Sequence, residues 1–260
     1  SNSVNEDTKP YCAWTFKKAP KFFDIVTYTG NGTAGRTIAH SLGSVPGMII
    51  VKQYQSGEAR TWSIYHRGVD SSAPENYRIH FTTAARADDA GQWNDTAPTS
   101  SVFTVGDSTY VNNNGESYVA YLFAHETGSD SMIQCGGITG NGNDFREIDL
   151  GWEPQLVMIK RYTSTGSWVV HDSMRGLPVG AADPYLLWND SSAEATDQQY
   201  VTPTASGFQV GVKGDGDGTY NNNSGSSYIY MAIRRPNMAT ITDATKVFAV
   251  DAGNGAIPEY

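Results

Sequence analysis

The chain has 260 residues, of which 39% are hydrophobic and only 17% are charged. This length fits one large all-β domain or two ordinary domains, and the composition is not that of a disordered chain. With 18 basic against 27 acidic residues the net charge is −9, and no run of Lys or Arg is present, so nucleic acid is not expected as a partner.

The amino-terminal segment, residues 1–19, is predicted to be an arm that ends in a first strand. Residues 1–10 are polar and acidic and lack the pattern of a signal peptide. No stretch of the chain approaches the roughly 18 apolar residues of a membrane span, so membrane insertion is not expected. Residues 11–16 alternate in a way that predicts a strand, which Lys17-Lys18-Ala19-Pro20 would end.

Short extended segments, each bounded by turn residues, are predicted along the rest of the first half. They are residues 22–28, 36–42, 48–52, 61–65, 77–82, 102–105 and 118–125. The last has apolar residues on both faces, which predicts a central strand that is covered on two sides. Because no window shows a period of 3.6 residues, the predicted class is all-β.

Much of the first half is then repeated. Thr29-Gly30-Asn31-Gly32 corresponds to Thr139-Gly140-Asn141-Gly142, and Lys52 corresponds to Lys160 at an offset of 160 − 52 = 108 residues. The correspondence continues through Trp62 and Trp168, Tyr77 and Tyr185, residues 112–114 and 221–223, and Tyr118 and Tyr228. A period of this size is that of a whole small domain rather than of one solenoid unit.

The predicted fold is therefore two tandem homologous β-sandwich units of jelly-roll or concanavalin-like type. The first unit would span residues 20–127 and the second residues 128–237, joined by a linker at residues 126–130. Residues 238–260 would form a carboxy-terminal strand, at 246–250, and a tail.

The two cysteines, Cys12 and Cys135, do not occupy equivalent positions of the repeat. A disulfide repeated in each unit is therefore excluded. One bridge between them and two unpaired thiols both remain open, and the second interpretation is preferred.

Nothing in the sequence predicts catalysis. There is no Gly-x-Ser-x-Gly nucleophile motif, and the five histidines have no partner at metal-ligand spacing; they are His40, His66, His80, His125 and His171. Glu147-Ile148-Asp149 resembles the start of the Glu-x-Asp-x-Glu strand of retaining glucanases, but Gly151 stands where the third carboxylate would be. We therefore expect no enzyme.

One glycine-rich loop, residues 214–221, is a candidate for calcium. Asp215 and Asp217 alternate with glycines and are followed by amide oxygens, which are ligands that Ca²⁺ uses. No closing glutamate follows, however, and the first copy offers only Asp107 before its asparagines. The alternative is a turn in which Asp and Asn side chains bond their own backbone, and no other cofactor is expected.

The loops carry aromatic and amide side chains, which suit sugar rings because one kind stacks and the other forms hydrogen bonds. The candidate ligand-binding residues are Trp93, Tyr110, Asn112, Asn113, Asn114, Trp188, Tyr200, Tyr220, Asn221, Asn222 and Asn223. The competing interpretation is that these are core aromatics and turn asparagines.

Residues 11–32, 40–52 and 118–125, together with Trp62 and Tyr65-His66-Arg67-Gly68, resemble a domain found in virion and tail-fibre proteins of tailed phages, especially marine ones. The second copy matches less closely, since it replaces Leu122-Phe123-Ala124-His125 by Ala232-Ile233-Arg234-Arg235. The resemblance implies a particle component of concanavalin-like sandwich character, assembled in the host bacterial cytoplasm. It brings no catalytic residues.

These observations together predict a non-catalytic phage virion protein of tail-fibre or receptor-binding type that binds a host-surface glycan. A purely structural decoration or tail component and a polysaccharide depolymerase are the alternatives. Expected partners are the glycan, other virion proteins and further copies of the chain, the last by analogy alone. The sequence leaves open the host, the ligand, the oligomeric state and whether the two units pack together.

Overall fold

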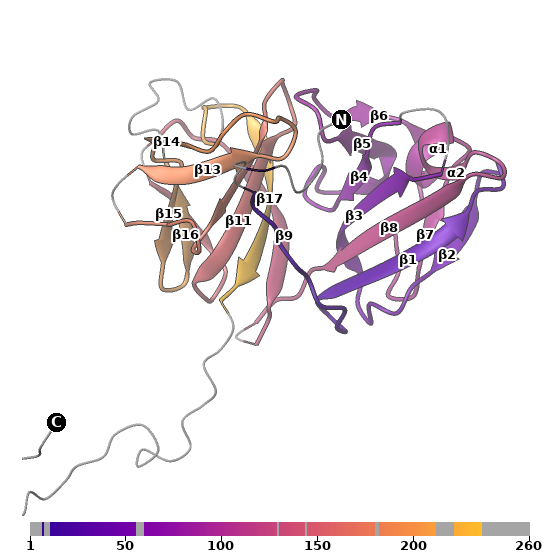
Figure 1. Ribbon diagram of the computed structural model, residues 1–260, viewed down its shortest axis with the longest axis horizontal. Helices are drawn as coiled ribbons and strands as arrows, with labels where there is room; N and C mark the ends of the chain where they lie inside the picture. The colour runs from indigo at the N-terminus through magenta and orange to yellow at the C-terminus, as the bar shows by residue number, and fades with distance from the viewer. Residues whose placement is uncertain are drawn as a thin grey trace, which may run out of the picture.

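The computed structural model describes residue 7 and residues 11–55, 60–128, 130–143, 145–179, 182–211 and 221–235. This part of the chain is all-β, with several antiparallel sheets in an arrangement compatible with β-sandwiches (Figure 1). In it, no helix is both long and apolar enough to cross a membrane.

The first half is built on a six-stranded sheet in the order β1-β8-β3-β4-β5-β6. Its strands are β1 (Phe23–Thr29), β3 (Pro46–Gln53), β4 (Ser63–His66), β5 (Tyr77–His80), β6 (Ala87–Asp88) and β8 (Ser117–Ala124). A second sheet pairs β2 (Arg36–Ala39) with β7 (Val102–Val105), and three single-turn helices intervene: η1 (Pro74–Asn76), α1 (Ala90–Trp93) and α2 (Thr109–Asn112).

The second half has a six-stranded sheet in the order β9-β17-β11-β12-β13-β14. Its strands are β9 (Ile133–Thr139), β11 (Pro154–Arg161), β12 (Trp168–Asp172), β13 (Asp183–Leu187), β14 (Ala195–Gln198) and β17 (Ser227–Arg234). The smaller sheet has three strands, β10 (Arg146–Asp149), β16 (Gly207–Val210) and β15 (Val201–Thr204). The large sheets thus follow the same strand order, and each has a register shift at the start of its long central strand, at Pro46/Met48 and Pro154/Leu156.

The predicted strands of the first half are confirmed, with one exception. β8 lies between β1 and β3 and is a central strand, as its two apolar faces predicted. Residues 11–16, predicted to be a strand, belong to no sheet. The rings of Trp14 and Phe16 pack against side chains of the two halves instead: Trp14 meets Trp188 at 5.8 Å between centroids, and Phe16 meets Phe123 at 5.3 Å. The predicted strand at residues 246–250 lies outside the described residues.

The hydrophobic core forms two clusters because successive strand residues point to opposite faces of a sheet. Val157, Ile159 and Phe208 belong to a cluster between the two sheets of the second half. Met158 and Met231, on the opposite face, join a larger cluster that includes the core of the first half. One face of the second large sheet is therefore buried against the first half.

The two halves approach closely enough for backbone contact. A Cβ added at Gly68 would lie 2.5 Å from the backbone carbonyl carbon of Gly136, so a larger residue at position 68 would push the halves apart. Hydrogen bonds also cross the boundary: the Trp168 indole donates to the carbonyl of His80 at 2.8 Å, and the Arg86 amide donates to the carbonyl of Tyr162 at 2.9 Å. The halves pack together rather than hang as separate units, a question that the sequence left open.

Candidate functional site

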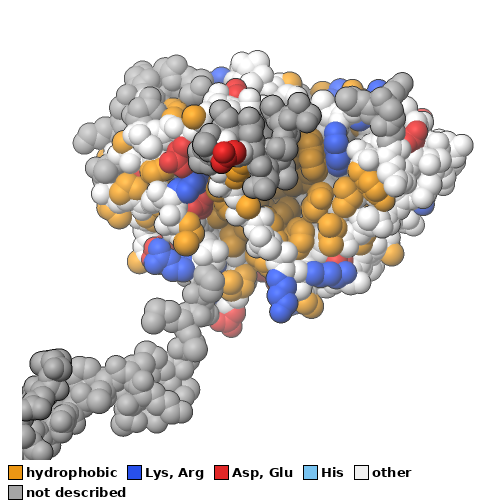
Figure 2. All heavy atoms as spheres, viewed as in Figure 1, with side chains coloured by type: hydrophobic (Ala, Val, Ile, Leu, Met, Phe, Trp, Pro, Cys, Tyr) orange, Lys and Arg blue, Asp and Glu red, His pale blue; other side chains and the backbone are white. Residues whose placement is uncertain are grey.

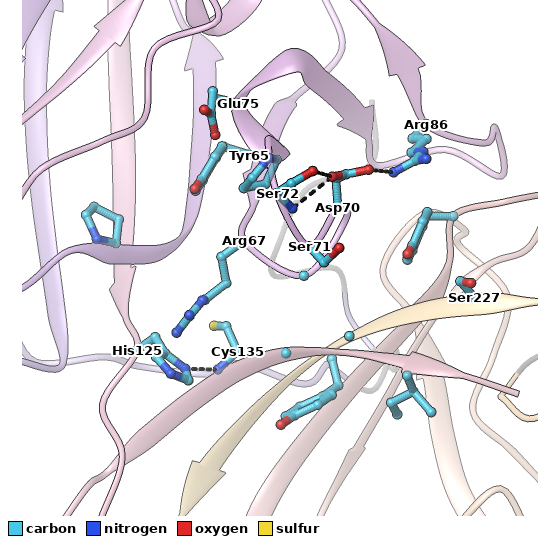
Figure 3. A pocket seen from close by; sticks show the side chains of 18 of the residues that line it. Tyr65, Arg67, Asp70, Ser71, Ser72, Glu75, Arg86, His125, Cys135 and Ser227 are labelled. Atoms are coloured by element: carbon cyan, nitrogen blue, oxygen red, sulfur yellow. Dashed lines mark hydrogen bonds and ion pairs between the residues drawn. The ribbon is translucent and has the colours of Figure 1, made fainter.

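A large cavity lies between the two halves, and we call it the polar cleft (Figure 3). It has a volume of about 970 Å³. The first half contributes Tyr65, Arg67, Gly68, residues 70–72, Pro74, Glu75 and Arg86, among others; the second half contributes residues 135–139 of β9, Tyr162, Thr163, Ser227 and Tyr230. Its walls therefore come from segments that are far apart in the sequence and meet only when the halves pack.

One corner of the polar cleft is fixed by an ion pair. The Asp70 carboxylate accepts hydrogen bonds from the amides of Ser72 at 3.0 Å and Ala73 at 3.2 Å and from the Ser72 hydroxyl at 2.9 Å, and it pairs with Arg86 at 3.2 Å. These bonds, the Ser72 amide first, lower the pKa of Asp70 to about 2. The Arg86 guanidinium also lies 3.9 Å from the centre of the Tyr77 ring. The charges of Asp70 and Arg86 therefore cancel each other at this corner.

The middle of the polar cleft carries an arginine, two tyrosines and a glutamate. Figure 3 shows that Arg67 extends from the turn after β4 into the cavity, while Tyr65 and Glu75 lie above it on the same half. Tyr230 comes from β17 of the second half, and its ring packs on Gly136, where a Cβ would lie 2.6 Å from the phenol. Rings, hydroxyls and both signs of charge therefore meet in one cavity.

Cys135 and His125 line the polar cleft, and His66 is buried next to it behind the Arg67 turn; the geometry leaves these three side chains little to do chemically. The Cys135 amide donates to His125 Nδ1 at 3.2 Å, and burial raises the pKa of the Cys135 thiol to about 12. The Gly68 amide donates to His66 Nδ1 at 3.0 Å, so His66 Nε2 carries the proton and donates to the Tyr230 carbonyl at 3.1 Å. Burial lowers the pKa of His66 to about 3. The Cys135 thiol therefore stays protonated, and the His66 imidazole stays neutral.

A second cavity between the halves, of about 540 Å³, is almost entirely apolar, and we call it the aromatic groove. It is lined by Trp14, Phe16, Phe23, Ile25, Ile50, Trp62, Phe81, Tyr121, Phe123 and Trp188, with Lys18 and Thr15 at its edge. Figure 2 shows the hydrophobic side chains gathered in the hollow between the halves. Because these rings pack mainly on one another, the groove offers few polar groups to orient a ligand.

One asparagine of each predicted loop, Asn112 in the first half and Asn222 in the second, is a structural lock. Asn112 is buried; its side-chain oxygen accepts from the Asn31 amide at 2.9 Å, and its amide group donates to the carbonyls of Thr33 and Gly106. Asn222 holds the Gly140-Asn141-Gly142 turn in the same way, accepting from the Asn141 amide at 3.1 Å and donating to the Asn143 carbonyl at 2.6 Å. These amides are saturated by the backbone, which favours the turn interpretation over ligand binding.

Their neighbours are also engaged in structure. The amides of Asn113 and Asn223 donate to the Tyr118 and Tyr228 hydroxyls, each at 2.8 Å, and Asn221 is buried and donates to the Tyr200 carbonyl. Asn114 is exposed.

The predicted aromatic residues do not converge on one site. Trp93 and Tyr200 are buried core residues, and Tyr110 is half-buried beside the His80 ring at 5.3 Å. Trp188 lines the aromatic groove. None of the predicted ligand-binding residues that the structure describes lines the polar cleft, and Tyr220 lies outside the described residues.

The calcium candidates Asp215 and Asp217 also lie outside the described residues. Within those residues, no group of three or more His, Cys, Asp or Glu side chains could hold a metal ion. Cys12 and Cys135 are both free, which confirms the preferred interpretation of the two cysteines.

Glu147 and Asp149 are exposed on β10 and line neither the polar cleft nor the aromatic groove. The Asp149 carboxylate accepts from the Gly151 amide at 2.9 Å, an ordinary turn contact. The histidines mostly bond to backbone, as His40 does with the Thr99 carbonyl at 3.2 Å and His80 with the Trp62 carbonyl at 2.8 Å.

His66 and His171 do not occupy corresponding positions in the two large sheets. His171 pairs with Val157 on the neighbouring strand and thus occupies the place of Tyr65, which pairs with Ile49. His66 corresponds to Asp172 in the same way.

The chain matches, over residues 1–236, a family described as a domain of unknown function, DUF7483. No curated protein and no solved structure matches it. Because the match spans most of its length, the chain belongs to this family.

Proposed function

We propose that this member of the DUF7483 family is a non-catalytic glycan-binding module, and that the glycan occupies the polar cleft. The observation that carries the proposal is the composition of that cavity. Its volume of about 970 Å³ has room for several sugar units, and its walls combine tyrosine rings, hydroxyl groups and both signs of charge. Tyrosine offers a sugar an apolar face and a polar tip, and serine, threonine and carboxylate groups can bond its hydroxyls.

The geometry of the polar cleft supports binding more than catalysis. A glycosidase needs one carboxyl group that can give up a proton and a second that stays ionised. Asp70 cannot be the acid, because its pKa is held at about 2 by four bonds that fix its carboxylate. Cys135 and His66 are held in their unreactive forms by burial. Glu75 is then left without an acid or base partner among these groups.

We further propose that the two halves are tandem homologous β-sandwich units that arose by duplication. Three features support this: the common strand order of the large sheets, the register shift at the same place in each, and the asparagine locks at Asn112 and Asn222. A turn hydrogen-bonded in the same way twice is difficult to obtain by chance. The jelly-roll or concanavalin-like assignment of each unit belongs to the same proposal.

The proposed biological setting is the surface of a phage particle, as part of a tail fibre or receptor-binding protein. This part rests on the resemblance of residues 11–32 and 118–125 to virion proteins. The module would meet a host-surface glycan through the polar cleft, while other faces would contact other virion proteins and further copies of the chain.

The direct test is a screen of the full chain against an array of bacterial surface polysaccharides, followed by titration of the glycans that bind. The double variant Tyr65→Phe/Tyr230→Phe removes the hydroxyls of these two tyrosines while keeping their rings, and we expect about tenfold weaker binding. Tyr54→Phe, an exposed tyrosine outside the cleft, is the matched control and should bind as the unchanged chain does.

The rival functions predict different results. A purely structural component would bind no glycan on the array. A depolymerase would release reducing ends from a bound polysaccharide, and loss of that release in Glu147→Gln or Asp149→Asn would place the activity on β10. If binding occurred but was unchanged in the double tyrosine variant, the polar cleft would not be the site.

A further inference from the structure

The polar cleft contains one arginine that the fold holds in place but does not neutralise. Arg67 sits in a turn that is fixed by its own amide, which donates to the Gly47 carbonyl at 2.9 Å, and by the Val69 amide, which donates to the His66 carbonyl at 3.1 Å. Figure 3 shows its side chain extending into the cavity without a dashed contact to any neighbour drawn. Among the described residues, its guanidinium has no hydrogen bond and no ion pair.

The second arginine of the cleft is already occupied. Arg86 pairs with Asp70 at 3.2 Å, donates to the Val69 carbonyl and stacks on Tyr77. Its charge is balanced and its planar face is covered. Of the two arginines that line the cleft, Arg67 is therefore the one available to a ligand.

Two phenol groups lie within the electrostatic reach of Arg67, one from each half. The rings of Tyr65 and Tyr230 are buried, and in the described part of the chain neither hydroxyl has a hydrogen-bond partner. Burial raises the pKa of Tyr230 to about 12 and that of Tyr65 further, and the charge of Arg67 acts on both in the opposite direction. Each hydroxyl thus remains protonated at neutral pH and can donate a hydrogen bond.

A guanidinium and two phenols form a set of donors, and such a set fits the oxygens of an anion. A guanidinium binds a carboxylate through two parallel N–H···O bonds, which a neutral sugar hydroxyl cannot accept. The rest of the cleft suits a singly charged ligand: the Asp70–Arg86 pair is neutral and Glu75 adds a negative charge near Tyr65. A strongly charged polyphosphate or polysulfate would be opposed by Glu75 and by the net charge of −9.

Resting on the proposed function, we propose that Arg67, assisted by Tyr65 and Tyr230, binds the carboxylate of an acidic sugar residue, and that the module selects glycans that contain such residues. Glu75 and the serine and threonine hydroxyls of the walls would then bond the ring hydroxyls of the same sugar. The carboxylate determines the selectivity, because leaving the guanidinium without its counterpart costs more binding free energy than losing a single hydroxyl contact.

Matched ligands that differ only in the charge test this directly. Oligogalacturonate and sialyllactose, each beside its carboxyl methyl ester, are titrated calorimetrically into the full chain at two salt concentrations. We expect at least one acid to bind about tenfold or more tightly than its ester, with the difference smaller at high salt.

Variants of the arginine assign the effect to its side chain. Arg67→Gln should bring the affinity for the acid down to that for the ester, and Arg67→Lys should keep part of the preference, since it retains the charge but not the planar fork. Lys21→Gln makes the same change in net charge at an exposed residue outside the cleft and should leave the preference intact. Arg67 is exposed, so the variants should unfold at the same urea concentration as the unchanged chain.

The outcomes separate this inference from the function on which it rests. Equal affinity for acid and ester, unaffected by Arg67→Gln but weakened by Tyr65→Phe/Tyr230→Phe, would overturn the acidic-sugar inference and leave glycan binding in place. Failure to bind any of these ligands or any polysaccharide of the array would overturn both.

Discussion

The two large sheets share a strand order, yet the same face of each meets a different environment. In the second half this face is closed: Trp168, Ile229 and Met231 are each 0% exposed and belong to the cluster shared with the first half. In the first half the matching face is half open, since Trp62 and Tyr121 are only partly buried and Ile25 is 40% exposed at the aromatic groove. The same strand order therefore presents a covered interface in the second half and an accessible groove in the first.

The corresponding lysines show the same contrast. Lys160 is fully buried, donates to the carbonyls of Thr83 at 3.1 Å and Gly166 at 2.6 Å, and has a pKa lowered by burial to about 8. Lys52, at the matching position, lies over the Trp62 ring at 5.6 Å and stays partly accessible. The backbone of Thr83, from the first half, thus provides a partner for the lysine of the second half. The matching faces of the two large sheets are therefore covered to different extents.

The largest effect is expected from the paired tryptophans. Trp168→Ala should lower the free energy of unfolding by about 3–5 kcal/mol, because it leaves a cavity at the boundary of the halves and removes the donor to the His80 carbonyl. Trp62→Ala should cost only about 1–2 kcal/mol, since part of that ring already meets solvent. Urea unfolding followed by circular dichroism measures both. Equal losses would show that the two faces are equally covered and would contradict the difference between a closed and a half-open face.

The asparagine locks should instead behave alike in both halves. Asn112→Ala and Asn222→Ala each leave buried backbone groups of a turn without partners, which should cost about 2–3 kcal/mol apiece. Asn114→Ala, an exposed neighbour, should change the stability by less than about 0.5 kcal/mol. A large loss from one lock and none from the other, measured by thermal unfolding, would contradict their equivalence.

The smallest effect is the pH dependence that Lys160 should produce. The pKa of Lys160 is about 8 in the folded protein and about 10.4 in an unfolded chain, so between these values the unfolded state binds more protons and stability rises with pH. Between pH 8 and 9.5 the gain should be on the order of 1 kcal/mol.

Lys160→Met should remove this gain, and Lys52→Met should not. Urea midpoints measured at both pH values compare the two variants with the unchanged chain. A persistent rise in Lys160→Met would assign the dependence to another group.

The asymmetric packing also explains why the polar cleft occurs once. Its walls join the turn after β4 of the first half to the Gly136-Gly137 segment of β9, and these are not corresponding parts of the two halves. Gly136 and Gly137 occupy the places of Val26 and Thr27 on β1, because Ile138 pairs with Tyr228 as Tyr28 pairs with Tyr118. A side chain at Gly136 would collide with the Tyr230 ring, and one at Gly137 would collide with the backbone of Gly68.

Sequence patterns were reliable where the cause is local. Alternation and turn residues predicted the strands of the first half, and the double apolar face of residues 118–125 predicted a central strand. Asn112 and Asn222 illustrate the limit. Their types and spacing are equally suited to a sugar site and to a turn, and the difference depends on backbone groups 79–81 residues away in the chain.

The candidate site lay beyond local patterns for the same reason. Arg67 follows His66 in a run with no motif, and Tyr230 looks like any other residue of a buried strand. Their common cavity forms only where the two halves pack against each other, and no spacing of residues in the sequence predicts that packing.

By itself the sequence determined the all-β class, the repeated turns and the position of most strands of the first half, since these follow from the side-chain period and from backbone preferences over a few residues. The tertiary structure decided which face of each sheet is covered, which asparagines are locks and where a charged side chain is left without a partner. Those outcomes depend on contacts between distant segments, whose free energy is set only when the two halves pack.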